Sequence, residues 1–379
     1  MKPIYLDYNA TTPIDHEVAE AMKPYLEEYF GNPSSLHLMG IAARKAVENA
    51  RRQVADLLNC IPEEIVFTSG GTESNNYAIK GIAFTNRQKG NHIITSTIEH
   101  PAVTEVCKYL ETFGFHTTYI PVDETGLINV EKLEKAITKE TILITVMHAN
   151  NEVGTIQPIE DISMITRKYG ITCHTDAAQS VGKIPTDINK LNVDLLSVAG
   201  HKVYAPKGIG TLFIREGIQL EKFMHGAGHE RNLRAGTENV LEIVGLGKAC
   251  EIAKRDLTAN MSHMTAMRDR LYNRLKNSIT GVRLNGHPEK RLPNTLNIGF
   301  KGLEASALLN DLIMADIAAS AGSACHAGST TISHVLEAMK VPLEYAMGTL
   351  RLSVGKMTTE DEIDRAVTEL TKAVQRYQK

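Results

Sequence analysis

The sequence has no tryptophan, few aromatic residues and no surplus of charge of one sign. Aromatic residues make up 5% of the 379 residues, which argues against the stacking platforms that bind single-stranded nucleic acid. Lysine and arginine number 41 against 44 acidic residues, a net charge of −3, so nothing predicts direct contact with nucleic acid or anionic lipid. No run is apolar over the ~20 residues that a membrane helix needs. The first residues reach Asp7 without the apolar stretch of a signal peptide.

Cysteine is also scarce, and its spacing excludes two common uses. The five cysteines are far apart and form no CxxC pair: Cys60, Cys107, Cys173, Cys250 and Cys325. This odd, scattered set predicts neither a disulfide framework nor a zinc ribbon and is typical of a reducing compartment. We therefore predict a cytoplasmic protein that does not contact a membrane. A buried free thiol is the ordinary interpretation of each cysteine except Cys325.

What is present is an average globular composition, with 42% hydrophobic and 22% charged residues. Between residues 40 and 256, short apolar runs alternate with helical patterns such as 41–58, 102–113 and 130–137. This alternation predicts an α/β fold with a mostly parallel, seven-stranded sheet covered by helices on both faces. The expected strands are 64–68, 92–96, 117–122, 142–148, 171–175, 195–199 and 210–214.

The pattern changes after residue 256, where a long polar helix is expected over Leu257–Ile279. Strands are predicted at 295–300, 317–320 and 349–353, and a closing helix at 359–377. Thr359 followed by Glu362 is a capping box for that helix. We predict a large domain over 16–256 and a smaller α+β domain built from 1–15 and 257–379.

Three motifs carry chemistry. A glycine-rich turn, 68–74, lies between an expected strand and a helix that offers free N–H groups to an anion, although an ordinary βα turn has the same pattern. Asp176 lies at the end of a strand, where α/β sheets bind ligands, and Lys202 follows the end of the next one. Each alone has a common structural explanation. Together they supply the phosphate anchor, the pyridinium partner and the amine of a pyridoxal phosphate site.

The chain resembles the cysteine desulfurases of the fold-type I pyridoxal phosphate enzymes, whose close relatives are selenocysteine lyases. The motifs run in order along nearly the whole chain. They are 5–13 (YLDYNATTP), 30–35 (FGNPSS), 68–74 (TSGGTES), 99–100 (EH), 150–154 (NNEVG), 176–179 (DAAQ), 200–202 (GHK), 228–231 (GHER), 234–237 (RAGT), 322–325 (GSAC) and 350–353 (LRLS).

The resemblance implies a role for each matching residue. Lys202 forms the internal aldimine with pyridoxal 5'-phosphate, and His100 stacks on its ring. Asp176 pairs with the ring nitrogen and keeps it protonated. Arg351 is the planar fork for the substrate carboxylate.

The remaining implied contacts hold the cofactor at its other edges. Asn151 and Gln179 address its phenolic oxygen. Thr237 reaches the phosphate from the neighbouring subunit, which implies a homodimer. The phosphate contacts within one chain are Gly71, Thr72 and His201.

Cys325 is the residue that the resemblance makes reactive. Its thiolate takes the sulfur of L-cysteine as a persulfide and leaves L-alanine. The persulfide then passes to an acceptor, either a scaffold for iron–sulfur cluster assembly or a tRNA thiolation protein. Cys325 could also be one ligand of a shared iron–sulfur cluster, although one cysteine does not complete such a site.

Two positions depart from the family pattern. Ala199 stands where relatives usually carry a serine that donates to the phosphate, and His326 follows the reactive cysteine where threonine or serine is common. A Cys-His pair at this position is similar to the one in selenocysteine lyases, so selenocysteine lyase activity is the alternative function. A cofactor-binding scaffold without turnover is a further alternative, against which intact Lys202, Asp176 and Cys325 argue. In an aminotransferase Cys325 would have no catalytic role, so this function is disfavoured.

Overall fold

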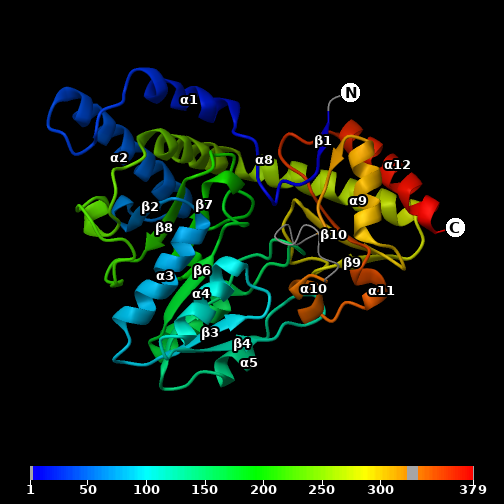
Figure 1. Ribbon diagram of the computed structural model, residues 1–379, viewed down its shortest axis with the longest axis horizontal. Coiled ribbons are helices and arrows are strands. Elements are labelled where there is room, and N and C mark those ends of the chain that lie inside the picture. The colour runs from blue at the N-terminus through cyan, green and yellow to red at the C-terminus, as the bar shows by residue number, and fades with distance from the viewer. Residues whose placement is uncertain (1–2, 322–331, 379) are drawn as a thin grey trace.

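The computed structural model describes residues 3–321 and 332–378, and its largest element is a seven-stranded sheet (Figure 1). Its strand order is β2-β8-β7-β6-β5-β3-β4. β8 runs antiparallel to its neighbours β2 and β7, and the other pairings are parallel. The predicted α/β class with a mostly parallel sheet is confirmed. The strands are β2 (Ile65–Thr68), β3 (His92–Ser96), β4 (His116–Ile120), β5 (Thr141–Thr145), β6 (Thr172–Asp176), β7 (Leu195–Ala199) and β8 (Gly210–Ile214).

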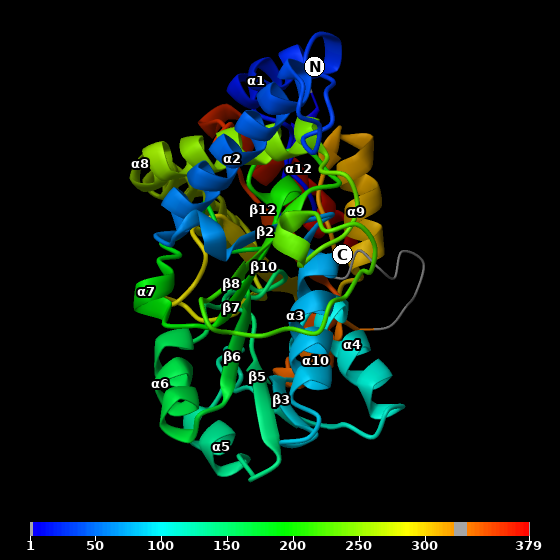
Figure 2. The same cartoon turned by 90° about the vertical axis from the view of Figure 1, so that its left-hand side faces the viewer.

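Helices cover both faces of this sheet because successive strand residues face opposite sides. Ile93, Leu143 and Leu195 pack with α3 and α4, whereas their neighbours Ile94 and Ile144 pack with α2, α6 and α8 (Val240–Ser278). Figure 2 shows α3 and α4 on one side of the sheet and α6 on the other. The strands therefore read as continuous apolar runs. The helices of this part are α1 (His16–Glu27), α2 (Leu38–Leu58), α3 (Gly71–Thr85), α4 (Pro101–Glu111), α5 (Val130–Lys135), α6 (Ile159–Tyr169) and α7 (Ile188–Leu191).

A second, three-stranded antiparallel sheet has the order β12-β10-β9. A separate short pair joins β1 to β11 in parallel, so the start of the chain lies beside residue 317. Helices α9, α12 and the end of α8 cover the three-stranded sheet with their own apolar core. The elements are β1 (Ile4–Tyr5), β9 (Val282–Asn285), β10 (Thr295–Phe300), β11 (Ile317–Ala318), β12 (Thr349–Ser353), α9 (Ala305–Met314), α10 (His334–Ala338), α11 (Leu343–Ala346) and α12 (Glu360–Tyr377).

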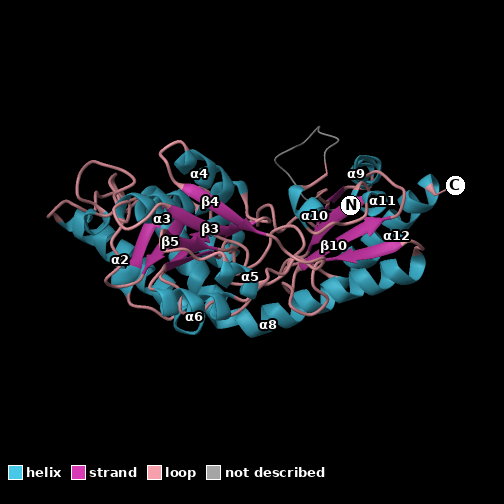
Figure 3. Cartoon of the chain, turned by 90° about the horizontal axis from the view of Figure 1, so that it is seen from below, coloured by secondary structure: helices cyan, strands magenta, loops and turns pink. Residues whose placement is uncertain are grey.

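One long helix, α8 (Val240–Ser278), runs past both sheets (Figure 3). Its first half contributes Ile243 and Leu246 to the large core, and its second half contributes Leu271 to the small one. The prediction of a helix starting at residue 257 was therefore wrong. Glycines weaken the helical pattern in the first half of α8. A Cβ on Gly247 would lie 2.5 Å from the Cα of Ala50 on α2, so close packing of the two helices requires glycine there.

The sequence-based division into a large domain over 16–256 and a smaller one over 1–15 and 257–379 stays a prediction. One helix, α8, continues through residue 257. Among the residues that the structure describes, no helix is long and apolar enough to cross a membrane.

Candidate active site

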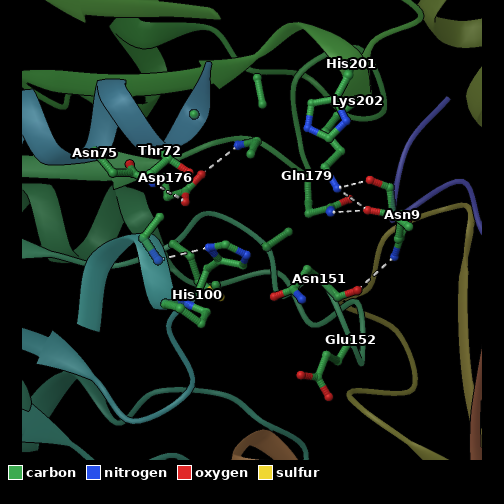
Figure 4. Close-up of a pocket in the computed structure, with 18 of the residues that line it drawn as sticks. Asn9, Thr72, Asn75, His100, Asn151, Glu152, Asp176, Gln179, His201 and Lys202 are labelled. Atoms are coloured by element: carbon green, nitrogen blue, oxygen red, sulfur yellow. Dashed lines mark hydrogen bonds between the residues drawn. The ribbon is translucent and has the colours of Figure 1, made fainter. Parts of the chain in front are cut away.

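A cavity of about 300 Å³ opens where the carboxyl ends of β6 and β7 meet the start of α3 (Figure 4). The three-stranded sheet closes its other side through Arg351 on β12. The cavity thus lies at the strand ends, where ligands of α/β sheets bind.

Asp176 is the last residue of β6 and lies at the cavity with 6% of its surface exposed. Its Oδ2 accepts from Nδ2 of Asn75 at 2.6 Å, and its Oδ1 accepts from the backbone N–H of Ala178 at 2.9 Å. These two donors fix the carboxylate in one orientation without neutralising it. A buried carboxylate held this way suits a cationic or N–H partner in the cavity.

The first turn of α3 forms the end of the cavity next to Asp176. Gly70 precedes the helix with φ of 148° and gives it no side-chain cap. Gly71 and Thr72 line the cavity, so backbone N–H groups and a hydroxyl face it together with the positive end of the helix dipole. This is a site for an anion. Ala199 packs opposite, 3.2 Å from where a Cβ on Gly71 would be, and adds no hydroxyl.

Lys202 and His201 lie in the turn that follows β7. The Lys202 amine donates to the backbone oxygens of Asn9 and Ala10, the latter at 2.7 Å. His201 Nδ1 lies 3.2 Å from Oγ1 of Thr11. Burial, with nearby Lys202 as a further cause, lowers the pKa of His201 to about 4. His201 is therefore neutral at pH 7 and acts through hydrogen bonds.

His100 precedes α4 and lines the cavity beside Asp176. Its Nδ1 accepts from the N–H of Ala102 at 3.1 Å, so the neutral ring carries its proton on Nε2. Burial lowers the pKa of His100, while the charge of Asp176 acts in the opposite direction. The ring is a flat, uncharged surface with one N–H.

On the opposite wall, Arg351 is 2% exposed and forms an ion pair with Asp7 at 2.8 Å. Its other terminal nitrogen donates to the backbone oxygen of Asn151 at 3.2 Å. Arg351 also lines the cavity. A fixed guanidinium there can bind a small carboxylate.

Gln179 completes the cavity between the two walls. Its Nε2 donates to the backbone oxygen of Asn9 at 3.0 Å, and its Oε1 accepts from the amine of Lys183 at 2.7 Å. Asn151 and Gln179 both line the cavity (Figure 4).

One predicted residue is not brought into this cavity. Thr237 is exposed in the segment before α8 and does not line the cavity. Cys325 lies outside the described residues. Within residues 3–321 and 332–378, no three His, Cys, Asp or Glu side chains gather as a metal site, and the cluster-ligand role of Cys325 stays a prediction.

Sequence reasoning assigned no role to several residues that line the cavity. Asn75 lies one helical turn after Thr72 and orients Asp176. Asn9 lies in the N-terminal motif, and its Nδ2 donates to Oγ1 of Thr295 at 2.8 Å. The spacing of Asn75 from Thr72 could have indicated it. The other polar lining residues without an assigned role are Glu152 and His334.

Comparison with known proteins gives consistent matches over the whole chain. Residues 4–366 match the aminotransferase class-V family. Cysteine desulfurase IscS of Dictyoglomus turgidum is 47% identical over 375 residues, covering 99% of this chain and 95% of that protein. Cysteine desulfurase IscS of Methanosarcina thermophila is 49% identical over 375 residues, covering 99% and 93%.

Solved structures agree with these relatives. A NifS-like protein has a TM-score of 0.93 at 41% identity and covers 99% of this chain and 100% of its own. SspA in complex with cysteine has a TM-score of 0.83 at 40% identity and covers 94% and 100%.

Proposed function

The chain belongs to the aminotransferase class-V family and is a cysteine desulfurase; on that premise we propose that it takes sulfur from L-cysteine, releases L-alanine and leaves a persulfide on Cys325. The observation that carries this proposal is the meeting of Asp176, Lys202 and the start of α3 in one cavity.

The residues present fit pyridoxal 5'-phosphate, the cofactor of this enzyme class. The uncapped start of α3 suits its phosphate, and Asp176 suits its ring nitrogen. Oδ1 of Asn75, buried beside Asp176, has no hydrogen-bond partner among the described residues, which marks this end as built for a polar ligand. When bound, the cofactor supplies an electron-withdrawing ring that stabilises charge on the substrate carbon.

The side chains around the cavity divide the remaining tasks. We propose that the Lys202 amine would bind the carbonyl end of the cofactor and would transfer the proton at the substrate carbon. The flat His100 ring covers one face of the site, and its Nε2 holds a proton that the substrate can share. Asn151 and Gln179 offer amides to the phenolic oxygen, and His201 adds a neutral contact to the phosphate. Arg351 fixes the substrate carboxylate, so that the thiol group is presented in one orientation.

Cys325 is proposed as the sulfur acceptor because the other cysteines are poorly suited. Burial raises the pKa of Cys60, Cys107, Cys173 and Cys250 to about 12, so few of these groups are thiolates at neutral pH.

The described residues on either side of the Cys325 segment contact the cavity walls. Ser320 exchanges backbone hydrogen bonds with Arg351 at 3.2 and 2.7 Å. Ser333 donates to Oε2 of Glu152 at 2.5 Å. The described residues on both sides of this segment are therefore attached beside Arg351 and Glu152, which supports the choice of Cys325 as the sulfur acceptor.

A single-turnover experiment tests this assignment. The holoenzyme is mixed with one equivalent of L-cysteine and its peptides are analysed by mass spectrometry. We expect one added sulfur atom on the Cys325 peptide, and none in Cys325→Ser, which keeps its cofactor absorption. Cys60→Ser is the matched control and should behave as the native enzyme. A persulfide only on Cys60, Cys107, Cys173 or Cys250 would overturn the assignment.

A homodimer is the second part of the proposal. Thr237 is exposed and does not line its own cavity, as expected of a residue that serves the partner's site. Exposed apolar side chains also gather around the end of α1 and the start of α2, with Phe30, Leu36 and Leu38 each more than 80% exposed. A second copy of the chain would bury this surface.

Mixing two inactive variants tests the shared site. In a hybrid of Lys202→Ala and Thr237→Ala chains, one site carries both lesions and the other carries neither. Partial recovery of activity after mixing supports the dimer. An active monomer in analytical ultracentrifugation would contradict it.

We propose a cytoplasmic protein that delivers its persulfide to an acceptor protein for iron–sulfur assembly or tRNA thiolation. The relatives named IscS support the first acceptor. Co-purification with tagged enzyme tests it.

Because His326 follows Cys325 in the sequence, selenocysteine lyase activity is the second candidate function. The ratio of the turnover rates with L-selenocysteine and L-cysteine decides between the two functions.

A further inference from the structure

A buried lysine lies directly behind the candidate active site. Lys183 is 4% exposed and is the single buried lysine among residues 3–321 and 332–378. Buried lysines ordinarily pair with a carboxylate, but the partner of this amine is the neutral Oε1 of Gln179, at 2.7 Å. Burial lowers the pKa of Lys183 well below its ordinary value, with Lys202 and Arg351 as further causes.

The amide of Gln179 is held from both ends. Its oxygen accepts from Lys183, and its nitrogen donates to the backbone oxygen of Asn9 at 3.0 Å. Because an amine donates and a carbonyl accepts, the two contacts allow only one of the two amide orientations. Figure 4 shows the ends of Gln179 and Lys202 side by side, both directed toward Asn9.

The turn that carries Lys183 is built without its side chain. Backbone hydrogen bonds from Lys183 and Ile184 to the oxygen of Ser180 close the turn. Gly182 packs so tightly against Val203, next to Lys202, that a Cβ there would lie 2.6 Å from Cγ2 of Val203. We therefore expect a substitution of Lys183 to leave the turn in place and to change only the group that contacts the Gln179 amide.

We propose that Lys183 is a positioning residue: its amine holds the Gln179 amide with Nε2 turned toward Asn9 and the cavity. This inference rests on the proposed function, because it takes the cavity as the cofactor site. Without Lys183 the buried oxygen of Gln179 lacks its donor, and the amide is held only by its contact with Asn9.

The test measures cofactor binding and the cofactor spectrum in addition to turnover. Lys183→Met removes the donor while keeping a long apolar chain, and Lys183→Gln retains an N–H donor. Gln179→Leu removes the amide, and the double variant Lys183→Met/Gln179→Leu shows whether the two act together. Lys190→Met, at an exposed lysine of α7, is the matched control.

We expect Lys183→Met to weaken binding of pyridoxal phosphate to the apoenzyme by about three- to tenfold, the effect of one neutral hydrogen bond. We also expect it to shift the cofactor absorption band. Lys183→Gln should restore part of both. Lys183→Met should have no further effect when Gln179 is already leucine.

Three outcomes would overturn the inference. These are unchanged affinity and spectrum in Lys183→Met, a lower melting temperature without either change, or fully additive effects in the double variant. Failure of the native protein to bind pyridoxal phosphate would instead refute the proposed function, so the two failures are distinguishable.

Discussion

The two walls of the cavity are built in different ways. On the seven-stranded side, Asp176 ends β6, Lys202 follows the end of the neighbouring strand β7, and Asn75 reaches Asp176 from α3. On the three-stranded side, Arg351 depends on a contact with Asp7, 344 residues away in sequence. One wall therefore follows from the order of strands, whereas the other forms only when distant segments meet.

This difference implies a division of tasks. Changes on the first wall should alter the chemistry of the bound cofactor, and changes on the second should alter substrate binding. Asn9 connects the walls, because its backbone oxygen accepts from Lys202 and Gln179 and its side chain donates to Thr295.

The largest effect is expected from Asp176→Ala on the first wall. If Asp176 pairs with the ring nitrogen of the bound cofactor as proposed, loss of the carboxylate would remove the charge that keeps this nitrogen protonated, and kcat should fall on the order of 10²–10³-fold. Steady-state kinetics with L-cysteine measures this, with the absorption spectrum as evidence that cofactor remains bound. Asp187→Ala, which removes a carboxylate that caps α7, is the matched control. Near-native turnover in Asp176→Ala would refute the assigned role.

A smaller effect is expected from Arg351→Lys on the second wall. Lysine keeps the charge but loses the planar fork, so KM for L-cysteine should rise about ten- to a hundredfold. The cofactor spectrum without substrate should not change, and that result separates the two walls. Arg376→Lys, at a position with 70% side-chain exposure, serves as the control. If the spectrum changes as much as KM, the division of tasks is wrong.

The first wall was easier to predict from the sequence than the second. Strand ends were visible as apolar runs followed by Asp176 and by Lys202, and these residues do meet. Asn9 was missed because hydrogen bonds between distant segments leave no periodic signal, whereas the helical spacing of Asn75 from Thr72 could have indicated Asn75. The first half of α8 was missed because Gly247 lowers helix propensity where packing requires it.

A third prediction concerns pH and a buried acid next to His100. Burial, and secondarily the charge of Asp176, raises the pKa of Glu99 from its ordinary 4.5 to about 8. Folding therefore takes up a proton between these two values, so this contribution to stability is complete below about pH 4.5 and is lost as pH rises toward 8.

Glu99→Gln removes this titration while keeping a polar group for Ser96 and Met147. The free energy of unfolding of Glu99→Gln relative to native should rise between pH 5 and 8, by at most about 1.4 kcal/mol per pH unit, and its melting temperature should rise relative to native over the same range. Thermal scans of both proteins across this range measure it. A constant difference would show that Glu99 does not titrate there.

The smallest effect is expected far from both walls, at the start of α12. Oγ1 of Thr359 accepts from the N–H of Glu362 at 3.3 Å, and the Glu362 carboxylate accepts from the N–H of Thr359 at 2.9 Å. Thr359→Ala removes half of this capping box, so the free energy of unfolding should fall by about 0.5–2 kcal/mol. Thr368→Ala, on the exposed face of the same helix, should instead be neutral or slightly stabilising because alanine has the higher helix propensity. Because α12 packs only in the small core, neither change should alter kcat or the cofactor spectrum. A loss of turnover in Thr359→Ala with cofactor still bound would mean that the small core transmits changes to the cavity, and that Arg351 depends on more than Asp7 for its position.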